Sequence, residues 1–151
     1  MKIAILGGGL MGQAMAEHLL QQKCDLSIYN RSIDKITGLS AQQATICRSA
    51  TEAVEQAEMI ILLLSDADAI ATVLDTVEPA AFADKLFIQM GTIAPDQSRH
   101  IENQLHGVAA SYLECPVLGS LPEARSGKLI LMAAGIEAHF HQALPLLKMI
   151  G

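Results

Sequence analysis

The sequence predicts an α/β fold with a doubly wound, mostly parallel sheet that carries helices on both faces. Short, continuously apolar segments alternate with helical segments along the chain, a pattern typical of strands that are buried on both faces. The first apolar segment, residues 2–6, runs directly into a glycine-rich turn and an amphipathic helix. No repeat, low-complexity tract or linker divides residues 1–151, so we expect them to form one domain.

The first half of the chain opens with a strand, a helix and a second strand. After the apolar strand of residues 2–6, apolar side chains recur at helical spacing until Gln21-Gln22-Lys23 closes the helix. The second strand covers residues 25–29. The same patterns then predict, in order, a helix over 34–39, a short extended segment over 44–46, a helix over 51–56 and an apolar strand over 59–64.

The second half continues this alternation. Apolar runs of four or five residues predict strands, and longer amphipathic segments predict helices. The expected elements are, in order, a helix over 67–74, a strand over 85–88, a helix over 94–105, strands over 110–113 and 129–133, and a terminal helix over 136–149.

The composition excludes several classes of protein. Hydrophobic residues make up 51% of the sequence and the mean hydropathy is +0.34, which is rich for this length and would suit a homo-oligomer. No apolar run reaches the roughly 18 residues of a membrane span, so we expect no membrane partner and a cytoplasmic location. A net charge of −6 without clustered basic residues argues against nucleic acid. The three cysteines lack disulfide or metal-ligand spacing, so we expect reduced thiols and no metal site.

The glycine-rich turn has the spacing of a dinucleotide-binding motif, Gly-x-Gly-x-x-Gly. Gly7 permits the tight turn off the strand, Gly9 lets the backbone approach a pyrophosphate, and Gly12 lets the helix pack against the strand. Leu10 and Met11 open that helix, where unpaired N–H groups meet the phosphates. Glycine turns also occur for structural reasons alone, but the strand before this one and the helix after it favour a Rossmann-like cofactor site.

The end of the second strand indicates which dinucleotide is bound. In such folds an acidic residue at this point hydrogen-bonds the ribose 2′-hydroxyl and disfavours a 2′-phosphate. Here the chain reads Asn30-Arg31-Ser32, with Lys35 one turn further on, a set that suits the 2′-phosphate of NADP better than NAD. The alternative is that Arg31 is a solvated charge and that Ser32 merely caps the next helix.

Residues 7–12, 90–95 and 114–120 form three blocks that together resemble the β-hydroxyacid dehydrogenase family, which includes 3-hydroxyisobutyrate dehydrogenases and the cofactor domain of 6-phosphogluconate dehydrogenase. Residues 7–12, Gly-Gly-Gly-Leu-Met-Gly, are similar to the family's Gly-Leu-Gly-x-Met-Gly. Residues 90–95, Met-Gly-Thr-Ile-Ala-Pro, resemble its Met-Ser-Thr-Ile-x-Pro segment. Residues 114–120, Glu-Cys-Pro-Val-Leu-Gly-Ser, resemble its Asp-Ala-Pro-Val-Ser-Gly-Gly loop. The order and spacing of the blocks extend the resemblance over essentially all 151 residues.

The resemblance implies an oxidoreductase that transfers a hydride between NADP and a small 3-hydroxy acid or semialdehyde. It implies that the backbone of the loop at residues 63–66, which contains Leu64 and Ser65, passes along the cofactor and that Thr92 lies beside the nicotinamide. It also implies that the third block holds the substrate carboxylate, here through Leu118, Gly119 and Ser120. At three positions the chain departs from the family: Leu118 cannot hydrogen-bond through its side chain, Gly91 replaces a hydroxyl residue and Gln89 replaces an aspartate.

The family's proton-transferring lysine has no counterpart among residues 1–151, because it lies on a helix beyond the cofactor domain. We therefore expect no catalytic residue here, a helical C-terminal domain that is absent from this sequence, and little or no turnover by the chain alone. Lys148 precedes the expected segment, and the five histidines form no catalytic set, so we expect surface or boundary positions for them. Two alternatives remain: a non-catalytic NADP-sensing or interaction module, and an S-adenosylmethionine methyltransferase with a similar glycine turn.

Overall fold

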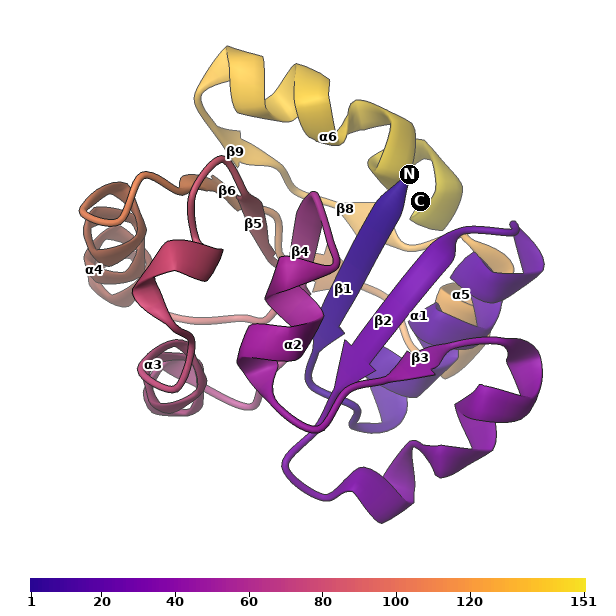
Figure 1. The fold of residues 1–151 in the computed structure, drawn as a ribbon. Helices are drawn as coiled ribbons and strands as arrows, with labels where there is room; N and C mark the ends of the chain where they lie inside the picture. The colour runs from indigo at the N-terminus through magenta and orange to yellow at the C-terminus, as the bar shows by residue number, and fades with distance from the viewer.

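A seven-stranded sheet forms the centre of the computed structural model, which describes residues 1–151, and its strand order is β3-β2-β1-β4-β5-β6-β9 (Figure 1). The first six strands in this order run parallel, and β9 pairs antiparallel with β6. The strands are β1 (Lys2–Leu6), β2 (Asp25–Tyr29), β3 (Thr45–Ile46), β4 (Met59–Leu62), β5 (Leu86–Gln89), β6 (Ser111–Glu114) and β9 (Ala134–Gly135). A separate two-stranded antiparallel sheet pairs β7 (Val117–Leu118) with β8 (Ile130–Leu131). The predicted doubly wound, mostly parallel sheet is confirmed.

Helices cover both faces of the sheet and bury a core on each. The helices are α1 (Leu10–Gln21), α2 (Ala50–Glu55), α3 (Ala67–Leu74), α4 (Pro95–His106), α5 (Leu121–Ser126) and α6 (Glu137–Ile150). In β1, Ile3 and Ile5 pack into the core beneath α1, α5 and α6, whereas Ala4 and Leu6 pack into the core beneath α2, α3 and α4. Successive side chains of a strand point to opposite faces, so a strand buried on both faces is continuously apolar.

The strand order reverses direction between β1 and β4, because the chain builds β1, β2 and β3 outward on one side and then crosses to β4, β5 and β6 on the other. Loops at the carboxyl ends of β1 and β4 diverge at this point and leave a crevice between them. Ligands of doubly wound sheets bind in this crevice. In this chain, the crevice lies between the loops after Leu6 and Leu62, which are therefore the expected ligand site.

Two predicted elements are wrong in type or length. The segment predicted as a helix over 34–39 forms two 3₁₀ helices, Ile33–Lys35 and Thr37–Gln42. Hydroxyl groups of Thr37 and Ser40 donate to carbonyl oxygens three residues back, which competes with regular α-helical bonding. The strand predicted over 59–64 ends at Leu62, because the chain must turn there into the Asp66 cap of α3.

The prediction also fails around the third block. Residues 129–133 do not add a strand to the main sheet. Only Ile130–Leu131 forms a strand, and it pairs with Val117–Leu118 in the two-stranded sheet. The helix α5 was not expected, although Pro122 at its start and left-handed Gly127 after its end are ordinary helix boundaries. No helix of the structure is long and apolar enough to cross a membrane.

Candidate functional site

The glycine turn between β1 and α1 has no space for side chains at two of its three motif positions. Gly7 has a φ of +118°, and a Cβ there would collide with the carbonyl oxygen of Leu63. A Cβ on Gly12 would collide with the carbonyl oxygen of Gly7. At Gly9, by contrast, a Cβ would meet no atom within 4 Å. Gly7 and Gly12 are therefore required for packing, whereas the space beside Gly9 is open to a ligand.

The start of α1 presents hydrogen-bond donors that the chain does not use. Gly9 caps the helix without a side chain, and the first intrahelical bond runs from the Gln13 N–H to the Gly9 carbonyl at 2.9 Å. The N–H groups of residues 9–12 have no partner in the chain, as is usual for the first turn of a helix. Leu10 is 72% exposed. These donors, together with the positive end of the helix dipole, suit a pyrophosphate.

A cleft of about 300 Å³ lies over this turn, between the loops that follow β1, β2 and β4. It is lined by six residues that the sequence predicted for the cofactor, which are Gly7, Gly9, Asn30, Arg31, Leu64 and Ser65. Leu63 of the predicted cofactor loop also lines it, and four lining residues were missed, namely Tyr29, Ala69, Thr72 and Val73. The last three lie on α3, and the only signal for them was the position of that helix directly after the loop at Ser65.

The predicted 2′-phosphate residues differ in their contacts. Asn30 accepts from the Gly8 N–H at 3.1 Å and donates to the Ser32 carbonyl at 2.9 Å, so it ties the glycine turn to the end of β2. Arg31 is exposed and makes no ion pair. Ser32 precedes a 3₁₀ helix, but its side chain makes no capping bond, so a purely capping role does not account for it. Lys35 is exposed and does not line the cleft.

Asp66, which follows the cleft residue Ser65, caps the start of α3 with its carboxylate. The Ala69 N–H and the Ser65 hydroxyl each donate to Asp66 at 2.8 Å. These bonds, the one from Ala69 first, hold the pKa of Asp66 below its usual value. Asp66 therefore stays ionised at neutral pH, and the Ser65 hydroxyl is directed at Asp66.

The third block forms a second helix start, but its donors are occupied. Leu118 is 60% exposed at the end of β7, and Gly119 follows it with a φ of +142°. The Ser120 hydroxyl and N–H both donate to the Glu123 carboxylate, at 2.6 and 2.8 Å. These two bonds, the one from the hydroxyl first, lower the pKa of Glu123. Two of the donors that the resemblance assigns to a substrate carboxylate are thus bound to a carboxylate of the chain itself.

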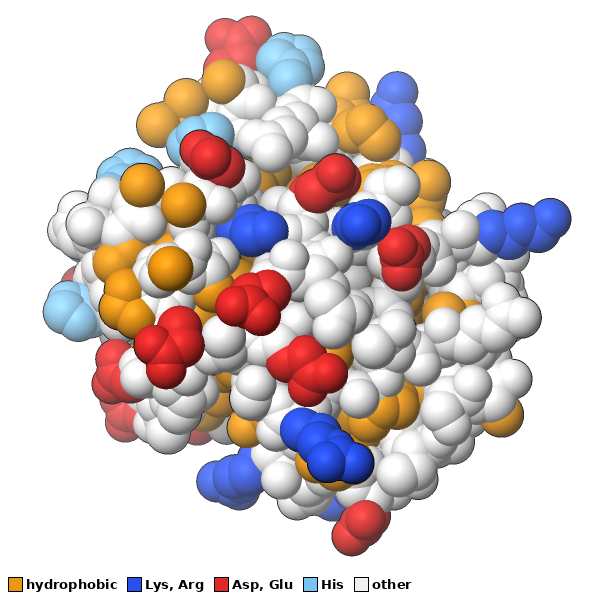
Figure 2. Space-filling model, in the orientation of Figure 1, with side chains coloured by type: hydrophobic (Ala, Val, Ile, Leu, Met, Phe, Trp, Pro, Cys, Tyr) orange, Lys and Arg blue, Asp and Glu red, His pale blue; other side chains and the backbone are white.

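Other predicted positions lie apart from the cleft. Thr92 is exposed in the loop between β5 and α4, on the carboxyl edge of the sheet and beyond β4. Met11 is half-buried and packs against the core through its side chain. Cys47 and Cys115 are buried, and burial raises the pKa of each thiol to about 11. Acidic and basic side chains are interspersed on the face shown in Figure 2.

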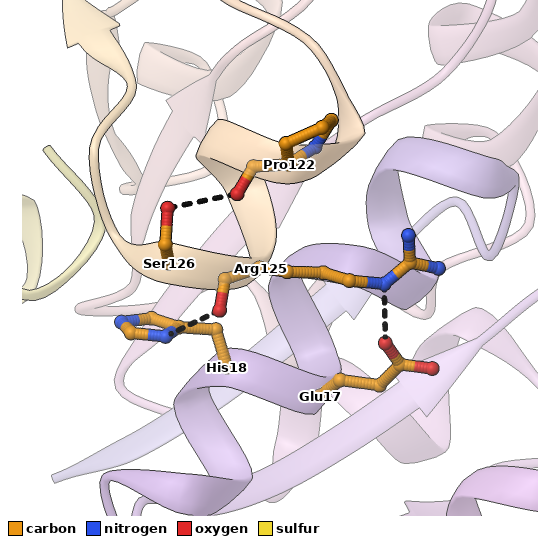
Figure 3. Close-up of polar contacts among 5 residues, drawn as sticks. All are labelled: Glu17, His18, Pro122, Arg125 and Ser126. Atoms are coloured by element: carbon orange, nitrogen blue, oxygen red, sulfur yellow. Dashed lines mark hydrogen bonds and ion pairs between the residues drawn. The ribbon is translucent and has the colours of Figure 1, made fainter.

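The expectation of a surface or boundary position is wrong for His18, which is 7% exposed. Its Nδ1 lies 3.1 Å from the Arg125 carbonyl oxygen and its Nε2 lies 2.8 Å from the Met149 carbonyl oxygen. Next to it, the Arg125 guanidinium donates to Glu17 at 2.9 Å (Figure 3). These contacts join α1 to α5 and to the end of α6. His18 is therefore a structural residue that joins the last turns of α1, α5 and α6.

Comparisons with known proteins agree with this geometry. Residues 2–151 match the family model described as the NAD binding domain of 6-phosphogluconate dehydrogenase. Glyoxylate/succinic semialdehyde reductase 1 of Arabidopsis thaliana is 32% identical over 154 residues, with 100% of this chain and 53% of the relative covered. The 3-sulfolactaldehyde reductase of Escherichia coli (strain K12) is 31% identical over 152 residues, with 99% and 51% covered.

A solved structure supports the same assignment. The 3-hydroxyisobutyrate dehydrogenase of Mycobacterium tuberculosis, solved with L-serine, has a TM-score of 0.93 at 27% identity, and 99% of this chain and 52% of that chain are covered. The chain thus spans about half the length of the relatives that it matches. With the glycine turn, the cleft and the strand order in agreement, the chain belongs to the family of NAD-binding domains of the 6-phosphogluconate and 3-hydroxyisobutyrate dehydrogenase type.

Proposed function

We propose that the chain is the NADP-binding domain of an oxidoreductase that transfers a hydride between nicotinamide and a small 3-hydroxy acid or semialdehyde. The observation that carries this proposal is the cleft at the start of α1, where unpaired N–H groups face open space beside Gly9. The cofactor supplies the hydride chemistry when it is bound, and the protein binds and orients it. Because the chain spans about half of its relatives, the activity of the whole protein is part of the proposal.

The preference for NADP over NAD rests on the end of β2. Arg31 lines the cleft with no ion-pair partner, so its guanidinium is free to pair with a phosphate. The Ser32 hydroxyl has no capping bond and is a second donor. Asn30 stands where an acidic residue would bind the ribose 2′-hydroxyl, and its amide carries no charge that would repel a 2′-phosphate.

The substrate class is supported by the relatives and by the third block. The matched proteins are named for glyoxylate and succinic semialdehyde, 3-sulfolactaldehyde and 3-hydroxyisobutyrate, which are small acids or aldehydes. We propose that Leu118, Gly119 and Ser120 lie against the substrate, with the free N–H of Gly119 as the available donor. Thr92 would lie beside the nicotinamide. The proton-transferring lysine of the family has no match in residues 1–151, so we propose that the chain alone shows little or no turnover.

A calorimetric titration with NADPH and, separately, NADH at identical salt tests the cofactor proposal. We expect NADPH to bind at least tenfold more tightly, since the 2′-phosphate adds charged hydrogen bonds worth about 1.5 kcal/mol or more. Equal affinities would contradict the assignment of Arg31. Absence of binding by either dinucleotide would contradict the function itself.

A second candidate function is an NADP-sensing or interaction module without catalysis. The observation that favours it is a group of exposed apolar side chains on and near the two-stranded sheet of β7 and β8, which are Leu118, Ile130, Met132 and Ile136. We propose a cytoplasmic location for either candidate. Sedimentation of the purified chain separates them, because a compact homodimer favours the module, whereas heterogeneous association favours a domain that packs against further polypeptide.

A further inference from the structure

One buried side chain in the core has no hydrogen-bond partner. Gln89, the last residue of β5, is 0% exposed, and neither its Nε2 nor its Oε1 has a partner. The three other buried polar side chains, His18, Ser27 and Ser98, all form hydrogen bonds. Because burying an unpaired amide is costly, such groups are rare in folded proteins and call for a physical explanation.

Gln89 lies at the ligand-binding edge of the sheet. In register it sits between Leu62 of β4 and Glu114 of β6, at the carboxyl ends of three parallel strands. Gln89 is two residues after Phe87 on this strand, so its side chain points to the same face as that of Phe87, which packs into the core beneath α2, α3 and α4. Leu64 packs against the same core and also lines the cleft. The amide is therefore on the same face of the sheet as the cleft.

The cleft accounts for only half of a dinucleotide. Its lining residues come from the ends of β1, β2 and β4 and from α3, whereas doubly wound folds bind one nucleotide on each side of the reversal point. The second nucleotide therefore belongs over the ends of β4, β5 and β6. Gln89 is the polar side chain buried at the centre of that half.

Gly91 gives the amide space to reach a ligand. A Cβ at residue 91 would lie 3.2 Å from Gln89 Nε2 and 3.2 Å from the Leu64 carbonyl oxygen. Gly91 is half-buried, so its position lies between the buried amide and the surface. A glycine at residue 91 therefore leaves space beside the Gln89 amide that a side chain would fill.

We propose that Gln89 is a positioning residue for the nicotinamide nucleotide, and that its amide pairs with a hydrogen-bonding group there, the carboxamide or a ribose hydroxyl. An amide offers both a donor and an acceptor, which matches either group. The proposal rests on the proposed function, because it requires a dinucleotide in the cleft. It explains why the chain keeps an unpaired amide in an otherwise apolar layer.

The test compares two ligands, NADPH and 2′-phospho-ADP-ribose, which lacks the nicotinamide. Gln89→Met keeps the length of the side chain and removes both polar atoms. We expect the variant to bind NADPH about tenfold more weakly, the effect of one lost hydrogen bond, and to bind 2′-phospho-ADP-ribose as the wild type does. Gln21→Met, a change at an exposed residue of α1, is the matched control and should alter neither affinity.

A second variant keeps the inference testable if Gln89→Met does not fold. Gly91→Ala leaves the amide in place but puts a methyl group in its path, so it should cause the same selective loss. An analogue of NADP⁺ that lacks the carboxamide distinguishes the two groups, because it removes both the carbonyl oxygen and the N–H₂ that could pair with Gln89. If its affinity is unaffected by Gln89→Met, the carboxamide is the partner; a tenfold loss assigns the ribose hydroxyl.

Two outcomes overturn the inference. Unchanged NADPH affinity in both variants, or an equal loss for NADPH and 2′-phospho-ADP-ribose, would show that Gln89 has no specific role at the nicotinamide end, while the proposed function would stand. Failure of the wild type to bind either ligand would instead overturn the proposed function, and this inference with it. The melting temperature of Gln89→Met provides a further check, since removal of an unpaired buried amide should leave it equal or higher.

Discussion

Two segments of the chain, assigned to anions by the glycine motif and by the family resemblance, both begin helices, and they differ in whether their donors are free. At the start of α1, the N–H groups of residues 9–12 have no partner and the space beside Gly9 is open. At the start of α5, the hydroxyl and N–H of Ser120 both bind the Glu123 carboxylate. A glycine before a helix leaves an open site, whereas a serine with a glutamate three residues later closes it.

The two helix starts, the first region at α1 and the second at α5, therefore differ in function, because the N–H donors at the start of α1 are free for a ligand, whereas the Ser120 donors at the start of α5 are bound to Glu123. The first region is prepared for a ligand phosphate, because its cap has no side chain. The second carries its own carboxylate, so an external acid must compete with Glu123 for Ser120 or use the Gly119 N–H instead. The cofactor end of the proposed site is therefore better formed than the substrate end in the structure of this chain.

The largest expected effect comes from the glycines of the first region. Gly12→Ala would place a Cβ against the Gly7 carbonyl, and we expect the free energy of unfolding to fall by about 3 kcal/mol. Gly9→Ala meets no atom within 4 Å and should change stability by less than about 0.5 kcal/mol while it weakens NADPH binding. Urea unfolding and calorimetry measure the two effects. Equal losses of stability would contradict the assignment of Gly9 to the ligand.

The second effect concerns the charge at the end of β2. Arg31→Asp replaces a guanidinium that lines the cleft with a repelling carboxylate, so NADPH affinity should fall about 30-fold, or roughly 2 kcal/mol, with NADH affinity equal or better. Arg99→Asp, at an exposed arginine of α4, is the matched control for net charge. An unchanged NADPH affinity in Arg31→Asp would remove this residue from the site.

A third effect tests the contacts of His18, which join α1 to α5 and α6. His18→Leu removes the imidazole that lies within hydrogen-bond distance of the Arg125 and Met149 carbonyl oxygens, and we expect a loss of about 1 to 2 kcal/mol of stability in urea unfolding. His106→Leu, at an exposed position of α4, should stay within about 0.5 kcal/mol of the wild type. If both variants unfold at the same urea concentration as the wild type, His18 does not connect α1 to α5 and α6.

The smallest expected effect is on how the stability of the folded chain changes with pH. The pKa of Glu123 is lower in the folded chain than usual, so the unfolded chain takes up a proton first as pH falls. The stabilisation is therefore complete above the usual carboxyl range and is lost as pH falls through the lowered pKa. Glu123→Gln should have a slightly lower melting temperature at pH 7 and a flatter acid profile than the wild type. Parallel profiles would show that the Ser120 cap does not contribute.

The first region could be predicted from sequence because its chemistry is local. Gly7, Gly9 and Gly12 lie within six residues, and backbone sterics alone determine what each one does. Arg31 follows the second strand directly, so its place at the cleft follows from the strand order. The lining residues on α3 could not be found in this way, because their position depends on how that helix packs across the sheet.

The second region was harder to predict, although part of its signal was present. Ser120 and Glu123 have the spacing of a capping box and Pro122 suits a first helical turn, which together indicate α5. The apolar run at 129–133 looked like a sheet strand because a short run does not reveal its partner. The sequence marked Gln89 as a departure from the family, but its burial and lack of a partner could not be predicted, since both depend on neighbours distant in the chain.

The most direct test is an amide NMR titration of the chain with NADPH, which reports on both helix starts in one experiment. We expect the N–H resonances of Gly9, Leu10 and Met11 to shift as the phosphates bind, while that of Ser120 stays in place because Glu123 holds it. Shifts at Ser120 without shifts at residues 9–11, or no shifts at all, would contradict the account of an open start of α1 and a closed start of α5.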